Sequence, residues 1–126
     1  MKLIKCVRAF AAIQNLMEKE CSFGDAYKLL RVRNNLMPKA EFFANEEMKI
    51  VKKYAVKDES GNVKFTDVGK FEFISEEAAL KYLEDMESLR NVDVEDFNPI
   101  SISAPMSITP AAIEALEGII SFQEEE

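Results

Sequence analysis

The side chains that could do chemistry in this sequence are mainly carboxylates. Their densest cluster comprises Glu84, Asp85, Glu87, Asp93, Glu95 and Asp96. Paired carboxylates can hold a divalent cation or act as a general acid and base. The first three would lie on different sides of a helix, however, and strand alternation places Asp93 and Glu95 on one outward face. We therefore interpret the cluster as a solvated acidic face. A functional role for it would be to meet a basic partner or to mimic nucleic acid.

Nucleophilic, metal and cofactor chemistry have few candidates. The 126 residues include no histidine, which removes Ser-His and Cys-His pairs and nearly every mixed His/Cys zinc site. Cys6 and Cys21 are separated by a helix that holds them about 20 Å apart, too far for a disulfide. Cys6 falls on an apolar stripe and is predicted to be a small buried hydrophobe, the alternative being a reactive thiol beside Lys5 and Arg8. The four glycines are scattered and form no phosphate-binding loop. The sequence thus predicts no catalytic residue, no metal ligand and no cofactor.

Charge is distributed unevenly along the chain. Residues 1–54 carry 11 basic and 6 acidic side chains, whereas residues 55–126 carry 5 and 17, for a net charge of −7. Either the two halves pack side by side and neutralise each other, or each presents a binding face. The best basic cluster is Lys28, Arg31, Arg33 and Lys39. The overall acidity argues against nucleic acid as the main partner.

Apolar spacing and capping residues predict four helices. They cover residues 6–18, 25–55, 76–90 and 109–117. Ser75 and Thr109 are the expected N-caps of the last two. Pro38 lies inside the long second helix, so we expect a kink near residues 34–37 or two helices in line.

Shorter segments predict a small sheet. Residues 63–65 and 71–74 are apolar on either side of a turn, which favours a hairpin. Residues 92–95 and 100–103 alternate with period two and predict a bent strand or a strand pair. The expected fold class is therefore α+β, with a mainly helical core containing a kinked long helix, plus a small antiparallel sheet. We expect one domain over residues 1–122, followed by an acidic C-terminal tail at residues 123–126.

The order of these elements is similar to a known group of small proteins. The features that carry the likeness are Lys52-Lys53-Tyr54 at a helix end, the Lys57-Asp58-Glu59-Ser60-Gly61-Asn62 turn, the alternating strand at 92–95 and the Ile108-Thr109-Pro110 helix start. Over roughly residues 1–122 the chain resembles bacteriophage and prophage proteins of unknown function. The segment at 71–74 departs from the longer acidic turns typical of such proteins. The resemblance implies a phage or prophage origin and a bacterial cytoplasm, and it transfers no site residue.

We expect a non-catalytic accessory or assembly protein that acts through protein–protein contacts, either with a protein partner or as a homo-oligomer. The alternative is an acidic regulatory inhibitor that binds a basic host protein, for instance by mimicking nucleic acid. An enzyme would need a convergent acid cluster and a pocket. The absence of a long apolar stretch or a secretion signal favours a cytoplasmic protein without a membrane partner.

The candidate interaction surface has three parts. Leu36, Ala40 and Phe43 belong to the apolar stripe of the long helix, Ile100 and Ile102 to a strand, and Asp93 and Glu95 to the acidic face. We expect the stripe over residues 29–51 to be partly intermolecular, because it is long for so small a core. Residues 99–108 could add to a partner's sheet or pair within their own.

Overall fold

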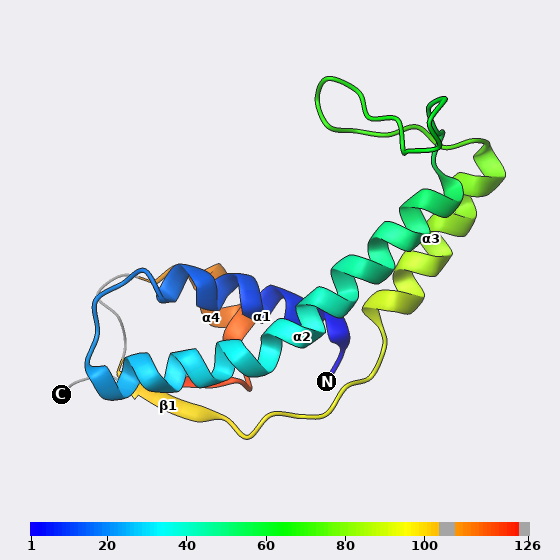
Figure 1. Cartoon of the computed structure of the whole chain (residues 1–126). Helices are drawn as coiled ribbons and strands as arrows, with labels where there is room; N and C mark the ends of the chain where they lie inside the picture. Colours follow the sequence, from blue (N-terminus) through cyan, green and yellow to red (C-terminus); the bar gives the residue numbers. More distant parts are fainter. Residues whose placement is uncertain (104–107, 124–126) are drawn as a thin grey trace.

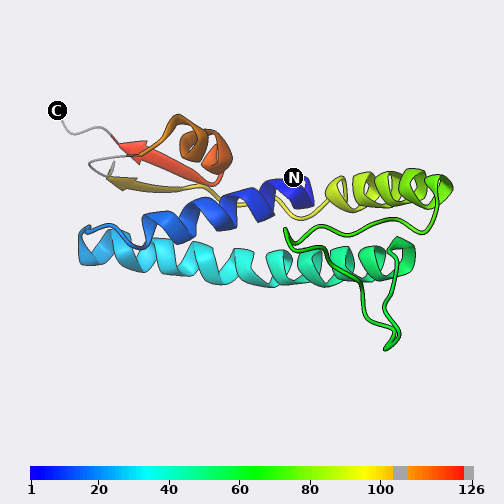
Figure 2. The ribbon, with the colours of Figure 1, turned by 90° about the horizontal axis from the view of Figure 1, so that it is seen from above.

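The computed structural model describes residues 1–103 and 108–123. Within these residues the chain forms four helices and a two-stranded sheet, in the order α1 (Leu3–Leu16), α2 (Phe23–Tyr54), α3 (Glu76–Arg90), β1 (Ile100–Ser103), α4 (Pro110–Leu116) and β2 (Ile120–Gln123). The fold is elongated (Figures 1 and 2). One end, which we call the body, combines α1, the N-terminal half of α2, and the unit formed by β1, α4 and β2. The other end, the arm, consists of residues 46–90.

Local signals determine where the helices begin. Ser22, Ser75 and Thr109 each accept a hydrogen bond from the backbone N–H three residues further on, as N-caps do. The predicted bounds of the third and fourth helices are confirmed to within a residue. The first helix begins at Leu3, three residues before its predicted start, and the residue before it, Lys2, is extended.

The long helix α2 is continuous over 32 residues, a length of about 48 Å. The alternative of two helices in line is therefore wrong, whereas a kink near residues 34–37 stays a prediction. Pro38 lies within the helix on an exposed position. Since proline has no N–H, it leaves the carbonyl four residues earlier without its helical partner, and an exposed carbonyl can bond to water instead.

Two groups of buried side chains form the core. The first lies in the body, where α1 packs on α2 and α4; it comprises Cys6, Ala9, Ala12, Ile13, Leu16, Leu29, Val32, Leu36, Ile102, Leu116, Ile119 and Ile120. The second lies where the arm begins and comprises Leu3, Phe43, Met86 and Leu89. Because α2 contributes to both groups, it joins the body to the arm.

The sheet is parallel, which corrects the predicted antiparallel arrangement. Residues 100–103 pair in register with residues 120–123, and α4 lies between the two strands in the chain. A helical crossover of this kind connects parallel strands, whereas antiparallel neighbours need only a tight turn. Residues 92–95, expected to belong to the sheet, form only a single bridge between Asp93 and Lys2.

The expected hairpin and tail also differ from prediction. Residues 63–65 and 71–74 form no regular strands, and Phe65 pairs with Phe71 in an isolated antiparallel bridge. The predicted tail began at Gln123, but this residue ends β2. The remaining three tail positions, 124–126, lie outside the described residues. Across the described ranges, no helix combines the length and apolarity needed to cross a membrane.

Candidate interaction surfaces

The predicted contact residues of α2 are covered by the chain itself. Leu36 has no exposed surface and lies in the core of the body. Phe43 is 7% exposed and packs with Leu3 and Met86. Ala40 is half-buried between them. At these positions the apolar stripe packs against α1 and α3, so the intermolecular role expected of it stays a prediction and we look elsewhere for exposed apolar surface.

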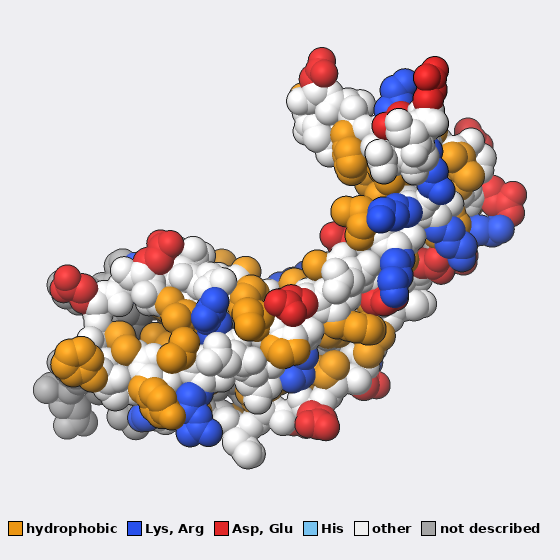
Figure 3. Space-filling view, in the orientation of Figure 1, with side chains coloured by type: hydrophobic (Ala, Val, Ile, Leu, Met, Phe, Trp, Pro, Cys, Tyr) orange, Lys and Arg blue, Asp and Glu red, His pale blue; other side chains and the backbone are white. Residues whose placement is uncertain are grey.

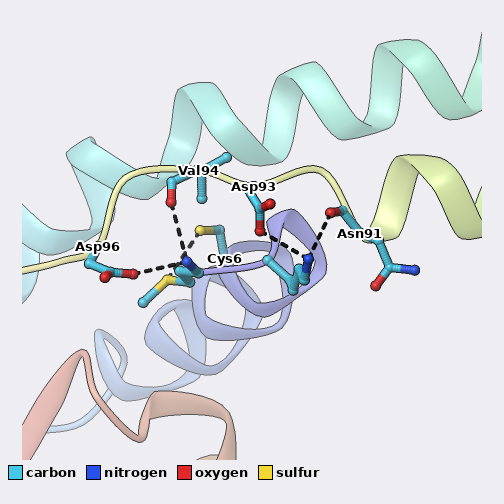
Figure 4. A network of polar contacts seen from close by, with 7 residues as sticks. Cys6, Asn91, Asp93, Val94 and Asp96 are labelled. Carbon is cyan, nitrogen blue, oxygen red and sulfur yellow. Dashed lines mark hydrogen bonds and ion pairs between the residues drawn. The ribbon is translucent and has the colours of Figure 1, made fainter.

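The predicted acidic residues lie on an extended segment that crosses the start of α1 (Figure 4). Lys2 Nζ forms an ion pair with Asp93 Oδ1 at 2.9 Å and donates a hydrogen bond to the Asn91 carbonyl at 3.3 Å. The hydrogen bond and positive charge of Lys2 lower the pKa of the Asp93 carboxyl. The Met1 ammonium similarly contacts Asp96 Oδ1 at 2.9 Å. Asp93 and Asp96 therefore each have a partner at the start of the chain, although their side chains stay mostly exposed.

Glu95 lines a groove that is also lined by three of the four residues of the predicted basic cluster. The groove has a volume of about 370 Å³ and is lined on α2 by Lys28, Arg31 and Lys39, facing Glu95 and Asp96. The fourth member of the predicted cluster, Arg33, is not among the lining residues. Basic groups of the first half thus face acidic groups of the second. Lys28 and Lys39 donate hydrogen bonds to the Ser101 carbonyl and to Asn35 rather than to these carboxylates, so neutralisation of one half by the other stays a prediction.

Ile100 and Ile102 belong to β1, which pairs within its own sheet. This confirms the second of the two expectations for residues 99–108, of which 104–107 lie outside the described residues. Ile102 is 4% exposed and Ile100 is half-buried, so both contribute to the body rather than to an open edge.

The two thiols are in different environments. Cys6 is fully buried, as its place on the apolar stripe predicted, and Cys21 is exposed. Burial raises the pKa of the Cys6 thiol, against the opposing positive charges of Lys39 and the N-terminal ammonium. A raised pKa keeps the thiol protonated and poorly nucleophilic at neutral pH. In the described ranges, no three Cys, Asp or Glu side chains gather closely enough to hold a metal ion.

The arm carries an exposed apolar surface that was not predicted from the sequence. On α3, Leu80 and Leu83 are 64% and 58% exposed. Ile74, Phe65 and Val68, in the segment between α2 and α3, are also exposed. Figure 3 shows hydrophobic side chains reaching the surface along the arm. We call Leu80 and Leu83, with the residues on the same side of α3, the outer face of α3.

The signal for this face was present in the sequence but ambiguous. By its spacing in the sequence, Leu83 belongs to one apolar stripe of the third helix together with Met86 and Leu89. In the structure Met86 and Leu89 are buried, whereas Leu83, which lies about a sixth of a turn from Met86 and a third of a turn from Leu89 around the helix axis, is exposed. Two apolar faces overlap on this helix, and periodicity alone does not say which of them the chain covers.

No family model matches the chain, and no match was found among the curated proteins or among the solved structures.

Proposed function

We propose that this protein is a non-catalytic accessory or assembly protein that acts through protein–protein contacts, and that it self-associates through the outer face of α3. The observation that carries the proposal is an excess of exposed surface. The chain exposes 8969 Å². A compact monomer of 14.3 kDa exposes about 6,800 Å². The difference, roughly 2,200 Å², exceeds the ~800 Å² that each partner buries in a standard interface.

The outer face of α3 is the best place for such an interface. Glu76, Leu80, Leu83, Glu87 and Arg90 recur at intervals of four and three residues, the spacing of a helix–helix seam. All five side chains are exposed. In an antiparallel pair of α3 helices related by a two-fold axis at Leu83, the two Leu83 side chains meet at the centre, and each Leu80 lies beside Glu87 of the partner subunit.

The same arrangement also matches charge. It places Glu76 of one chain beside Arg90 of the partner subunit, at both ends of the pair. Antiparallel packing also opposes the two helix dipoles. The first turn of one α3, which contains Glu76, then lies beside the last turn of the other, which contains Arg90. The face is therefore complementary to itself at its apolar centre and in the charges at its two ends.

The acidic-inhibitor alternative draws less support, because Asp93 and Asp96 already contact Lys2 and the Met1 ammonium. We therefore test self-association first.

Light scattering over a range of concentrations tests the proposal. The native chain is expected to approach twice 14.3 kDa as concentration rises. Arg90→Glu places like charges opposite each other and should shift the monomer–dimer equilibrium toward monomer by about tenfold. Adding Glu76→Arg to the same chain restores the pairing with reversed signs and should recover the dimer.

Phe23→Ser is the matched control, because Phe23 is 96% exposed and lies at the start of α2, outside the arm. It should leave the mass unchanged. A steady monomer of the native chain would refute self-association. Failure of the double variant to recover the dimer would refute the antiparallel α3 arrangement.

A further inference from the structure

The groove of about 370 Å³ in the body lies between α2 and the extended chain that leads into β1 (Figure 1). At one end Lys28 Nζ donates a hydrogen bond to the Ser101 carbonyl at 2.8 Å. At the other end Lys39 Nζ lies 5.4 Å from the centroid of the Phe97 ring. The groove therefore has a helical wall and an extended wall, which run in opposite directions and contact each other at both ends.

The helical wall presents a row of N–H donors. Its polar residues recur at intervals of three or four positions, so they follow one side of α2 over about 16 Å; they are Lys28, Arg31, Asn35 and Lys39. Asn35 accepts the Lys39 ammonium with its side-chain oxygen at 3.0 Å, which leaves the N–H groups of the Asn35 amide as donors. The wall thus combines three cationic side chains with one neutral donor.

Among the residues that the structure describes, the three cations of this wall form no ion pair with a carboxylate. Lys28 and Lys39 bond to neutral oxygen atoms. The Arg31 guanidinium lies over the Tyr27 ring, 6.0 Å from its centroid, a contact that leaves its N–H groups available. Arginine presents these donors in a planar fork that matches the oxygen atoms of a phosphate. The helical wall is therefore suited to an anion with several oxygen atoms.

The extended wall supplies acceptors. Glu95 and Asp96 line it. Asp96 contacts the Met1 ammonium at 2.9 Å, whereas the carboxylate of Glu95 has no ion-pair partner within residues 1–103 and 108–123. An ionised carboxylate only accepts hydrogen bonds, so its partner in a ligand must be a donor such as a hydroxyl group. A ligand that satisfies both walls consequently carries an anionic group on one side and hydroxyl groups on the other.

From these two walls we propose that the groove binds a phosphorylated sugar, either free or as part of a mononucleotide. The phosphate accepts hydrogen bonds from Arg31 and Lys28, and the sugar hydroxyls donate to Glu95. A nucleic-acid strand fits less well, because a chain with a net charge of −7 repels a polyanion. The groove lies in the body, away from the outer face of α3, so this proposal and self-association can each fail without the other.

Isothermal titration calorimetry of the full chain tests the proposal, with ribose 5-phosphate, adenosine 5′-monophosphate and inorganic phosphate as probes at one ionic strength. At least one phosphorylated sugar should bind about tenfold more tightly than inorganic phosphate, because only the sugars offer hydroxyl donors to Glu95. Tighter binding of the nucleotide than of ribose 5-phosphate would identify a mononucleotide as the ligand, and equal or weaker binding would identify a free sugar phosphate. If neither sugar binds more tightly than inorganic phosphate, the proposal is wrong.

Three variants at exposed positions locate the site. Arg31→Gln should weaken binding of the tighter sugar probe by about tenfold. The matched control, Arg8→Gln, makes the same charge change on α1, outside the groove lining, and should leave the affinity unchanged. Glu95→Gln should weaken binding by about fivefold through loss of the charged acceptor, whereas mere attraction of the phosphate to positive charge would make this variant bind more tightly. Equal weakening by the two arginine variants, or tighter binding to the Glu95 variant, would overturn the assigned site.

Discussion

At the scale of single residues, the arm depends on a polar contact between its two helices. Tyr54, at the end of α2, is 7% exposed, and its hydroxyl donates a hydrogen bond to Asp85 Oδ2 on α3 at 2.7 Å. Phe71 packs edge to face on both Phe73 and Tyr82, which are tilted relative to each other, and the ring centroids lie 5.1 to 5.8 Å apart. Asp85, which the sequence placed in a solvated acidic cluster, therefore has a structural partner.

Replacing Tyr54 by phenylalanine should lower the free energy of unfolding by about 1–2 kcal/mol, because it removes a hydrogen bond to a charged acceptor in a partly buried place. Urea unfolding followed by circular dichroism measures the change. Tyr27→Phe is the control, since Tyr27 is 62% exposed, and it should change stability by less than about 0.5 kcal/mol. Equal effects of the two variants would show that the Tyr54 hydroxyl does not stabilise the arm.

At the scale of elements, α2 determines the shape of the molecule. Its N-terminal half packs in the body with Leu29, Val32 and Leu36, and its C-terminal half packs against α3 with Phe43. Pro38 lies between these two packing regions. A proline in a helix interior weakens the helix locally, and here that weakness coincides with the point where the packing partner changes.

Pro38→Ala tests whether the weakness is needed. Alanine restores one backbone hydrogen bond at an exposed position, so the free energy of unfolding should rise by about 1–3 kcal/mol. Chemical denaturation measures it, with Asn34→Ala, exposed on the preceding turn, as the comparison variant. A loss of stability in the Pro38 variant would contradict this expectation. It would mean that packing on both sides requires the helix to bend there.

At the scale of the whole molecule, the elongated shape separates the outer face of α3 from the body. The outer face lies on the arm, beyond the point where the packing partner of α2 changes (Figure 1). Self-association through α3 would therefore leave the body accessible in each copy.

The elongation itself is measurable. A compact domain of 126 residues has a radius of gyration of about 14 Å. Small-angle X-ray scattering from the Arg90→Glu variant, which should be monomeric, is expected to give a clearly larger value because the arm projects from the body. A value at the compact limit would contradict this shape, and would mean that the arm folds back over the body in solution.

Helices and their ends could be predicted from the sequence because the signals are local. Ser75 and Thr109 cap α3 and α4 through the hydrogen bonds expected of them, since a cap depends only on residues three positions away. The burial of Cys6 followed equally from its place on an apolar stripe. The β2 strand was missed because four residues after a short helix carry no periodic signal. Its pairing with β1 depends on a contact across 20 positions of the chain.

The sequence by itself determined the class of the protein: a mainly helical α+β chain, with capped helices, a buried thiol at Cys6 and no histidine chemistry. These follow from residue type and from spacing within one or two turns of helix. Only the tertiary structure decided which apolar surfaces are covered. Leu36 is buried in the core and Leu83 is exposed, although both lie on apolar stripes. The reason is that a side chain on such a stripe is buried only where another helix packs against it. It also decided that Lys28 and Asp25 of α2 bond to the backbone of β1, since hydrogen bonds across more than 70 positions leave no local pattern.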